Sequence, residues 1–267
     1  MDYAALVARL RSHAKVARIT RYGTIAEKGR SWPLLRLDTP GSPRLLITAG
    51  FHGDEQAGPL TLAQHFGTIA RYARARKVGL TVFPCLNPSG FELSTRYNAS
   101  GEKPNNDFLR YELEDGSEEG VLYGKDPAFR RWRLFKQGPQ ETRAIRRALE
   151  RVRTPVAALD LHQDNYMRRA ATYAYVFGDA QLYLPLALRS KKHLPLAARV
   201  QVDPRLVTDS NGFIWFHDGS VTDWFWRRGV RYAAALETTT LGAPKKCDAV
   251  NLIWIRGFID LVALARL

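Results

Sequence analysis

Short apolar runs alternate with longer amphipathic stretches along this chain of 267 residues. The runs are rich in aliphatic and β-branched residues and stop at glycine, proline or a polar residue, a pattern typical of strands buried inside an α/β protein. Predicted strands cover residues 31–37, 45–51, 79–83, 156–162, 172–177 and 230–237.

Four segments carry apolar residues at helical spacing. Predicted helices cover residues 3–13, 56–76, 139–152 and 249–267. Polar turns are expected after the first helix, up to residue 30, and the prolines of 179–208 exclude one long helix there. Residues 87–126 show little periodicity, and a connection of this length is usually functional or mobile.

The composition is that of a globular enzyme, with 45% hydrophobic and 25% charged residues. Its length fits one α/β hydrolase domain spanning residues 1–267. No apolar run approaches a membrane span, and the N-terminus lacks the residue order of a secretion signal, so we expect a cytoplasmic protein without membrane contact. In that setting Cys85 and Cys247, the only cysteines, are expected to be free thiols.

The formal net charge of +14 is the strongest anomaly of the composition. Such a charge can mark a nucleic-acid-binding protein, or a positive field that attracts acidic substrates. The basic residues are spread over several segments without the repeated aromatic residues of an RNA-binding sheet. Solvated helix faces are therefore the favoured interpretation, and a nucleic-acid partner is disfavoured.

Two of the predicted strands end at histidine. The run from residue 45 stops at His52, with Glu55 three positions on, and the strand from 156 ends at His162. Ligand crevices in open α/β sheets form at the carboxyl ends of strands. Two histidines and one glutamate are a common catalytic zinc set that leaves the fourth position for water. The sequence therefore predicts one Zn²⁺ per chain at these three residues.

Several further segments resemble the zinc carboxypeptidase superfamily, which includes the aspartoacylase and succinylglutamate desuccinylase branch. The resemblance extends from about Leu45 to Glu237 and preserves the order and spacing of its parts. Besides the ligands, its segments are 87–90, Arg96, Asn105, 159–162, 219–224, 229–232 and 236–237. The resemblance implies an α/β fold with a mixed, mostly parallel central sheet flanked by helices, and hydrolysis of an amide bond near a substrate carboxylate.

By the same resemblance, Arg96 would polarise the scissile carbonyl, Asn105 would touch the substrate carboxylate and Glu237 would be the general base. Chemistry supports these roles. Glu237 ends an apolar run whose burial should raise its pKa, which suits a base acting on a metal-activated water. Arg96 stays charged, and one well-placed donor to an oxyanion contributes about 3 to 4 kcal/mol.

Asn106 departs from the family pattern. Relatives carry an arginine at this position that clamps the substrate carboxylate, and a neutral amide lacks that bidentate, charge-assisted contact. We keep Asn106 as a predicted substrate contact. The four arginines that could supply the missing charge are Arg110, Arg130, Arg168 and Arg169.

Lys103 is a second departure. It replaces an aspartate that orients a zinc-binding histidine in relatives, and losing such a partner can weaken metal binding tenfold or more. Glu102 and Asp107 are the candidates to compensate.

The segment before Gly219 departs from the pattern as well. The carboxypeptidase tyrosine that closes over substrate is missing, and His217 is the nearest proton donor, although packing is an open alternative. The resemblance makes Asp223 a wall of the substrate site, while the local sequence equally suits a helix N-cap.

The leading hypothesis is a zinc-dependent, carboxypeptidase-like hydrolase of peptides. An N-acyl amino acid deacylase of the aspartoacylase or succinylglutamate desuccinylase type shares every catalytic residue and is the first alternative. The second is an inactive, basic nucleic-acid-binding protein on the same fold. Substrate identity and oligomeric state stay open at this stage.

Overall fold

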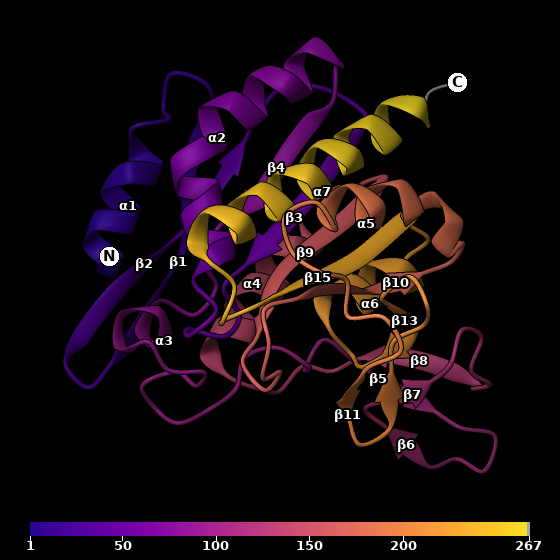
Figure 1. Ribbon diagram of the computed structural model, residues 1–267. Coiled ribbons are helices and arrows are strands. Elements are labelled where there is room, and N and C mark those ends of the chain that lie inside the picture. The colour runs from indigo at the N-terminus through magenta and orange to yellow at the C-terminus, as the bar shows by residue number, and fades with distance from the viewer. Residues whose placement is uncertain (266–267) are drawn as a thin grey trace.

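A computed structural model describes residues 1–265 and shows one large, twisted sheet with helices on both faces (Figure 1). The sheet has eight strands in the order β1-β2-β4-β3-β9-β15-β10-β13. In chain order they are β1 (Arg18–Glu27), β2 (Arg30–Asp38), β3 (Arg44–Ala49), β4 (Gly79–Phe83), β9 (Ala157–Asp164), β10 (Thr172–Phe177), β13 (Phe213–Ile214) and β15 (Tyr232–Thr239).

The sheet is mixed, with a parallel centre. β4, β3, β9 and β15 run parallel to one another, whereas β2 pairs antiparallel with β1 and β4, and β10 pairs antiparallel with β15 but parallel with β13. Parallel strands buried on both faces need no polar alternation, which is why the central strands read as continuous apolar runs. The predicted fold class is confirmed.

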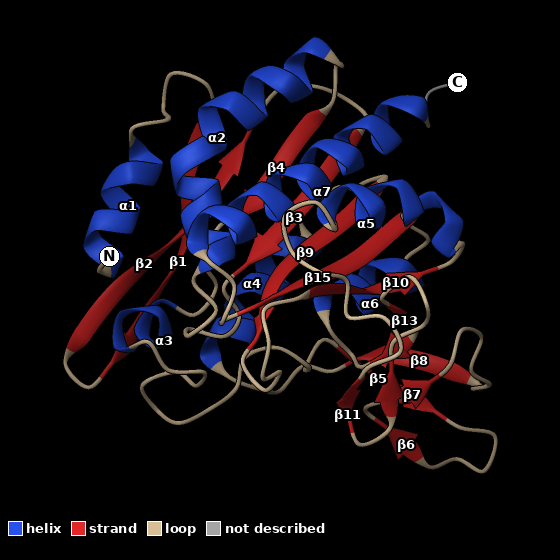
Figure 2. Ribbon diagram, viewed as in Figure 1, coloured by secondary structure: helices blue, strands red, loops and turns tan. Residues whose placement is uncertain are grey.

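Each face of the sheet is covered by its own set of helices (Figure 2). Side chains alternate along β3, so that Leu45 and Ile47 enter one apolar cluster and Leu46 enters another. The first cluster lies under α1 (Tyr3–Arg11), α2 (Ala57–Ala75), α5 (Leu184–Ser190) and α7 (Pro244–Leu264). The second lies under α4 (Gln140–Glu150) and α6 (Val221–Arg227).

Smaller elements gather beyond one end of the sheet, in the lower part of Figure 2. Three short strand groups lie there: β5 (Leu109–Glu112) with β6 (Glu118–Glu119) and β8 (Arg131–Leu134), β7 (Leu122–Tyr123) with β14 (Phe216–His217), and β11 (Gln201–Asp203) with β12 (Leu206–Val207). The remaining helices are α3 (Pro88–Leu93) and the 3-10 turn η1 (Ala180–Leu182). The segment 87–126 thus contains a helix and strands, but each is too short to produce a detectable hydrophobic periodicity in the sequence.

The polar turns predicted before residue 30 are wrong, because β1 occupies residues 18–27. This strand lies at the sheet edge, has only two buried residues, and has a register shift between Arg21 and Gly23. Both features remove the apolar alternation by which a strand is detected.

The last helix, α7, begins at Pro244, five residues before its predicted start. Its predicted end at Leu267 lies outside the described residues. Cys85 and Cys247 are both buried and free, as expected. Within residues 1–265 no helix is long and apolar enough to cross a membrane.

Candidate metal centre and active site

Three predicted ligands meet at the carboxyl edge of the parallel strands. His52 and Glu55 lie in the loop that follows β3, and His162 lies on β9, which pairs parallel to β3. The loop turns tightly at Gly50, whose φ of 69° lies in the left-handed region that favours glycine. It also packs closely on Gly90, and Gly53 permits this because a Cβ there would come within 1.9 Å of the Gly90 carbonyl carbon.

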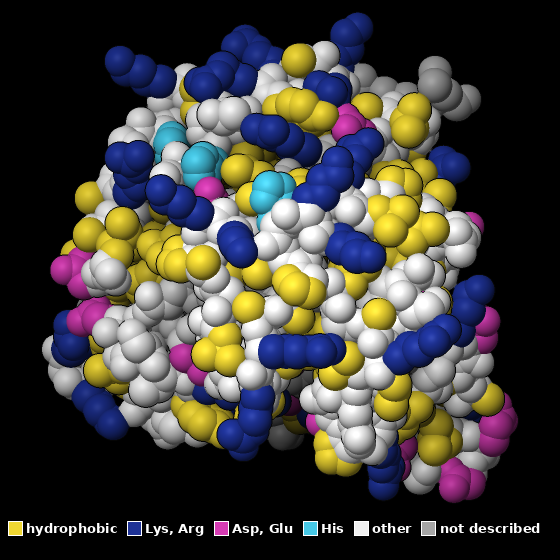
Figure 3. Space-filling model, in the orientation of Figure 1, with side chains coloured by type: hydrophobic (Ala, Val, Ile, Leu, Met, Phe, Trp, Pro, Cys, Tyr) yellow, Lys and Arg dark blue, Asp and Glu magenta, His cyan; other side chains and the backbone are white. Residues whose placement is uncertain are grey.

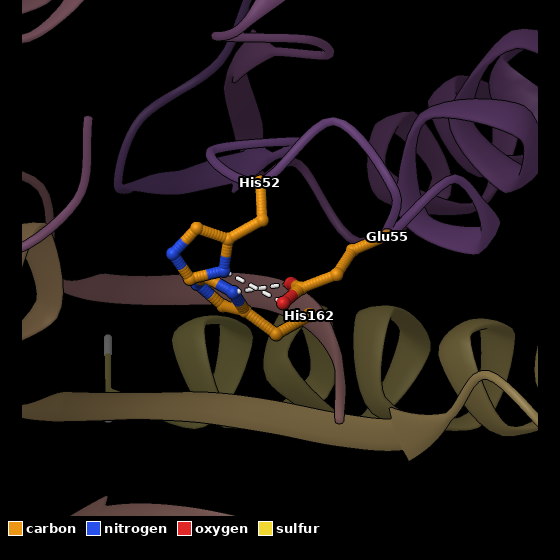
Figure 4. Close-up of side chains that lie close together, drawn as sticks. All are labelled: His52, Glu55 and His162. Atoms are coloured by element: carbon orange, nitrogen blue, oxygen red, sulfur yellow. Dashed lines mark hydrogen bonds and ion pairs between the residues drawn. The ribbon is translucent and has the colours of Figure 1, made fainter. Parts of the chain in front are cut away.

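Both histidines direct Nδ1 at the Glu55 carboxylate (Figure 4). The distance from His52 Nδ1 to Oε1 is 2.6 Å, and that from His162 Nδ1 to Oε2 is 2.8 Å. One ligand atom from each residue lies within 4.8 Å of the others, and all three side chains are buried. Two imidazole nitrogens and a carboxylate converging in this way fit a divalent metal ion such as zinc.

Asp160 fixes the orientation of the His162 ring. Its Nε2 lies 2.8 Å from Asp160 Oδ2, and Thr48 Oγ1 donates to the other oxygen of that carboxylate at 2.8 Å. An Nε2–H donor to Asp160 leaves the lone pair on Nδ1, the atom that faces the cluster. Asp160 and Glu55 together outweigh burial and raise the pKa of His162 well above its ordinary value.

His52 lacks such an outer partner. Its Nε2 is buried and has no hydrogen-bond partner among the described residues. Of the two candidates to compensate for Lys103, Asp107 pairs with Arg110 and Glu102 accepts from Asn98. No hydrogen bond joins either to His52 within residues 1–265, and burial lowers the pKa of His52.

Arg96 lies against the ligand cluster. Its Nη1 donates to Glu55 Oε1 at 2.7 Å, and its guanidinium carbon is 5.2 Å from the ring centre of Tyr166. Burial works against the charged form, but Glu55 and other nearby acids outweigh it and raise the pKa of Arg96. A permanent positive charge is therefore fixed beside the cluster.

Glu237 faces the same space from β15. It is paired in register with His162 on β9 and with Tyr173 on β10. Its Oε2 is buried and unpartnered within the described chain. Burial, reinforced by Glu55 and Asp164, raises the pKa of Glu237 well above its ordinary value, against the opposing influence of His162 and Arg96. The geometry is that of a carboxylate with one free oxygen next to the ligands.

One pocket contains most of the predicted site. The predicted residues that line it are His52, Glu55, Arg96, Asn105, Asn106, His162 and Glu237. Asn105 Oδ1 is buried without a partner in residues 1–265, while Asn106 donates to Asp218. Among the described residues that line the pocket, neither His217 nor Asp223 is found.

His217 and Asp223 lie behind the pocket wall. Their side chains meet at 3.0 Å, and Asp223 also accepts hydrogen bonds from Tyr111 and from the Gly219 N–H. Ser220 is the N-cap of α6, so the N-cap interpretation of Asp223 is wrong. Both side chains are therefore held by hydrogen bonds inside the protein, and neither is among the described residues that line the pocket.

The pocket also has members that sequence reasoning missed, among them Asp218, Tyr173 and Tyr175, and it includes Lys103, which the sequence analysis identified only as a departure from the family pattern. Among the described residues, none of the four arginines proposed as substitutes lines it, so Lys103, whose pKa is lowered by burial and by Arg96, is its second basic side chain after Arg96. The alternation of Tyr173, Tyr175 and Phe177 along a predicted strand was an available signal for a shared face.

Comparison with known proteins agrees with this geometry. A sequence profile described as the succinylglutamate desuccinylase/aspartoacylase catalytic domain matches residues 41–205. Murein peptide amidase A of Escherichia coli K12 is 35% identical over 86 residues, which are 32% of this chain and 34% of the amidase. The chain thus matches about a third of the length of that curated relative.

Solved structures share the fold. A protein of Shewanella amazonensis SB2B, assigned provisionally as a metallopeptidase, superposes with a TM-score of 0.73 at 24% identity, covering 97% of this chain and 92% of that one. A metallo-carboxypeptidase of Burkholderia cenocepacia gives 0.64 at 14% identity, with coverage of 99% and 68%. At these identities the likeness describes the fold alone.

Proposed function

Because this chain belongs to the succinylglutamate desuccinylase/aspartoacylase catalytic-domain family, which indicates a hydrolase, we propose that it is a zinc-dependent hydrolase of amide bonds. The observation that carries the proposal is the convergence of His52, Glu55 and His162 beside a free Glu237 oxygen. We further propose that residues 1–267 act as one hydrolase domain, with a peptide as substrate.

His52, Glu55 and His162 would hold the metal. Zinc bound there would supply a Lewis acid and a water whose pKa falls to about 7. Glu237 takes a proton from the attacking water and returns it to the leaving nitrogen, since its free oxygen faces the cluster and its raised pKa suits both steps. Arg96 stabilises the oxyanion that forms on the attacked carbonyl.

The peptide reading is supported by the murein peptide amidase match, because that relative's name describes cleavage of an amide bond in a peptide. The deacylase alternative is supported by the family profile itself, which covers the ligands and Arg96. The third hypothesis, an inactive basic binding protein, has no support from the site, because the proposed metal ligands and the proposed base line one pocket.

The test compares wild type with Glu237→Gln after both are loaded with zinc. Each is offered blocked dipeptides and N-acyl amino acids, and metal content is measured by elemental analysis. We expect about one zinc in both proteins, turnover by wild type, and a loss of at least 100-fold in kcat in the variant. Preference for dipeptides supports the peptidase, and preference for N-acyl amino acids supports the deacylase. Zinc-loaded wild type without turnover of either class would refute the proposal.

A further inference from the structure

The charge of the pocket is opposite to that of the chain. The chain carries a net +14, and Figure 3 shows Lys and Arg side chains spread widely over the displayed face. The pocket is lined by two basic side chains, Arg96 and Lys103, and by six carboxyl groups. These are Glu55, Asp160, Asp164, Asp203, Asp218 and Glu237. Burial raises the pKa of Glu237, but the other five carboxylates still outnumber the four positive charges of Arg96, Lys103 and a bound divalent metal, so the pocket does not favour an acidic substrate group.

Four of the carboxylates have other partners or the role assigned above. Glu55 belongs to the ligand set, Asp160 orients His162, and Glu237 is the proposed base. Asp164 accepts hydrogen bonds from the backbone N–H groups of Tyr166 and Met167 and from the Tyr173 hydroxyl. Asp164 also lies two residues after His162 on β9 and acts on Glu237, so it belongs to the metal end of the pocket. Asp203 and Asp218 are the carboxyl groups outside that end.

Of these two, Asp218 is the one built into the wall. Side chains alternate at β14, so that Phe216 and Asp218 face the pocket while His217 faces the protein interior. The Ser220 N–H donates to Oδ1 of Asp218 at 3.0 Å and the Asn106 amide donates to Oδ2. Asp203 lies on the exposed β11 strand at the rim.

Asp218 has no cationic partner within ion-pair distance in the described part of the chain. Two neutral donors hold its carboxylate in one orientation without neutralising the charge. Burial, together with the neighbouring Asp223, raises the pKa of Asp218, so the ionised form is disfavoured there and a substrate cation would offset that cost. Lys103 lines the same pocket and Asp218 acts on its charge, but the two form no salt bridge within residues 1–265, and burial lowers the pKa of Lys103.

Aromatic side chains line the space beside Asp218. The ring of Phe216 lies 6.1 Å from that of Tyr175 and 5.2 Å from that of Tyr123, measured between centres. Tyr175 is paired in register with Ala235, two residues before Glu237 on β15, and the small Ala235 side chain also lines the pocket. Aromatic walls accept an aliphatic stem and attract a cation at their faces.

From these contacts we infer that the pocket selects a substrate group ending in a positive charge, an ammonium or guanidinium on an aliphatic stem, with Asp218 as its counter-ion. The stem lies along the wall formed by Tyr175 and Phe216, and the scissile amide reaches Glu237 past Ala235. The inference rests on the proposed function for the position of the amide. It runs against one interpretation of the net charge, a positive field that attracts acidic substrates.

The experiment uses zinc-loaded full-length protein and substrates matched in stem length. Lysine and norleucine differ by the terminal ammonium group, so blocked dipeptides and N-acetyl forms of each are compared, with glutamate forms as the acidic reference. A charge-assisted hydrogen bond predicts a kcat/KM 10- to 100-fold higher for the lysine substrate. Binding of free lysine and norleucine, measured by calorimetry, gives the same comparison without turnover.

Two variants test the assignment to Asp218. In Asp218→Asn the lysine-to-norleucine ratio is expected to fall to about 1, and in Asp218→Lys the preference should shift toward glutamate. Asp115→Asn makes the same change of charge in an exposed turn that lies outside the pocket lining and should keep the wild-type ratio. Thermal melts establish that each variant is folded.

The outcomes separate the two proposals. Absence of turnover with all substrates refutes the amide hydrolase, while the calorimetric preference for lysine still supports the cation pocket. Equal binding and equal turnover of lysine and norleucine by wild type overturn the cation pocket whatever the variants do. A folded Asp218→Asn that keeps a tenfold preference also overturns the assignment to Asp218.

Discussion

Replacing Asp160 by asparagine should weaken metal binding by 10- to 100-fold. Asparagine keeps the shape of the side chain and an acceptor oxygen for His162, so the change removes chiefly a negative charge. The contact is short, at 2.8 Å between Nε2 and Oδ2, and both side chains are buried. Without the carboxylate, the imidazole is a weaker ligand and its tautomer is less firmly fixed.

The magnitude follows from the charge-assisted character of the bond. A hydrogen bond to a charged group contributes about 1.5 to 3 kcal/mol, and each 1.4 kcal/mol is tenfold in an equilibrium constant. The Thr48 contact to Asp160 survives in the asparagine variant, so packing around the site should change little. We expect the lower half of the range if solvent reaches His162 in the variant.

The assay is a competitive titration of zinc against a chelator of known affinity at one pH and ionic strength. Asp203→Asn is the matched control, since it removes one carboxylate from the same pocket without contacting a ligand histidine. A change below twofold in Asp160→Asn, or an equal loss in both variants, would refute the reasoning, because general pocket charge would then govern metal affinity.

Three further perturbations test other parts of the structure. Arg96→Ala should lower kcat by 100- to 1000-fold in steady-state assays at unchanged zinc content; a change below tenfold argues against oxyanion stabilisation. Lys103→Asp should tighten zinc binding about tenfold by giving the unpartnered His52 nitrogen an acceptor, as measured in the same titration. Burial raises the pKa of Glu141 to about 7 from 4.5, so stability should fall as pH rises between these values, where the unfolded chain has already lost that proton. Glu141→Gln should remove this slope and stabilise the protein by about 2 kcal/mol at pH 8 in urea unfolding, with Asn98 retaining its acceptor; an unchanged slope contradicts the assignment.

Local patterns carried much of the fold and of the ligand set. The central strands are continuous apolar runs because both of their faces are buried, and α2 shows helical spacing because it packs one face on the sheet. His52 and Glu55 could be predicted from the sequence because they follow the end of a predicted strand and lie only three positions apart. The edge strand β1 was missed because exposure and a register shift erase its alternation.

The direction in which individual side chains point could be known only from the tertiary structure. His217 and Asp218 are neighbours in sequence, yet pairing of β14 with β7 turns the first inward and the second to the pocket. Neither residue type nor the resemblance specifies that direction, because a one-residue change of register would exchange them.

The sequence by itself determined the strand runs, the family resemblance and the residues able to bind a metal, because these depend on composition and short spacings. Only the tertiary structure decided which charges share a pocket. Net charge is a sum over the whole chain, whereas the field at a site depends on the few side chains that converge there from distant segments. In this protein Lys and Arg predominate in the chain as a whole, while carboxylates predominate in the pocket.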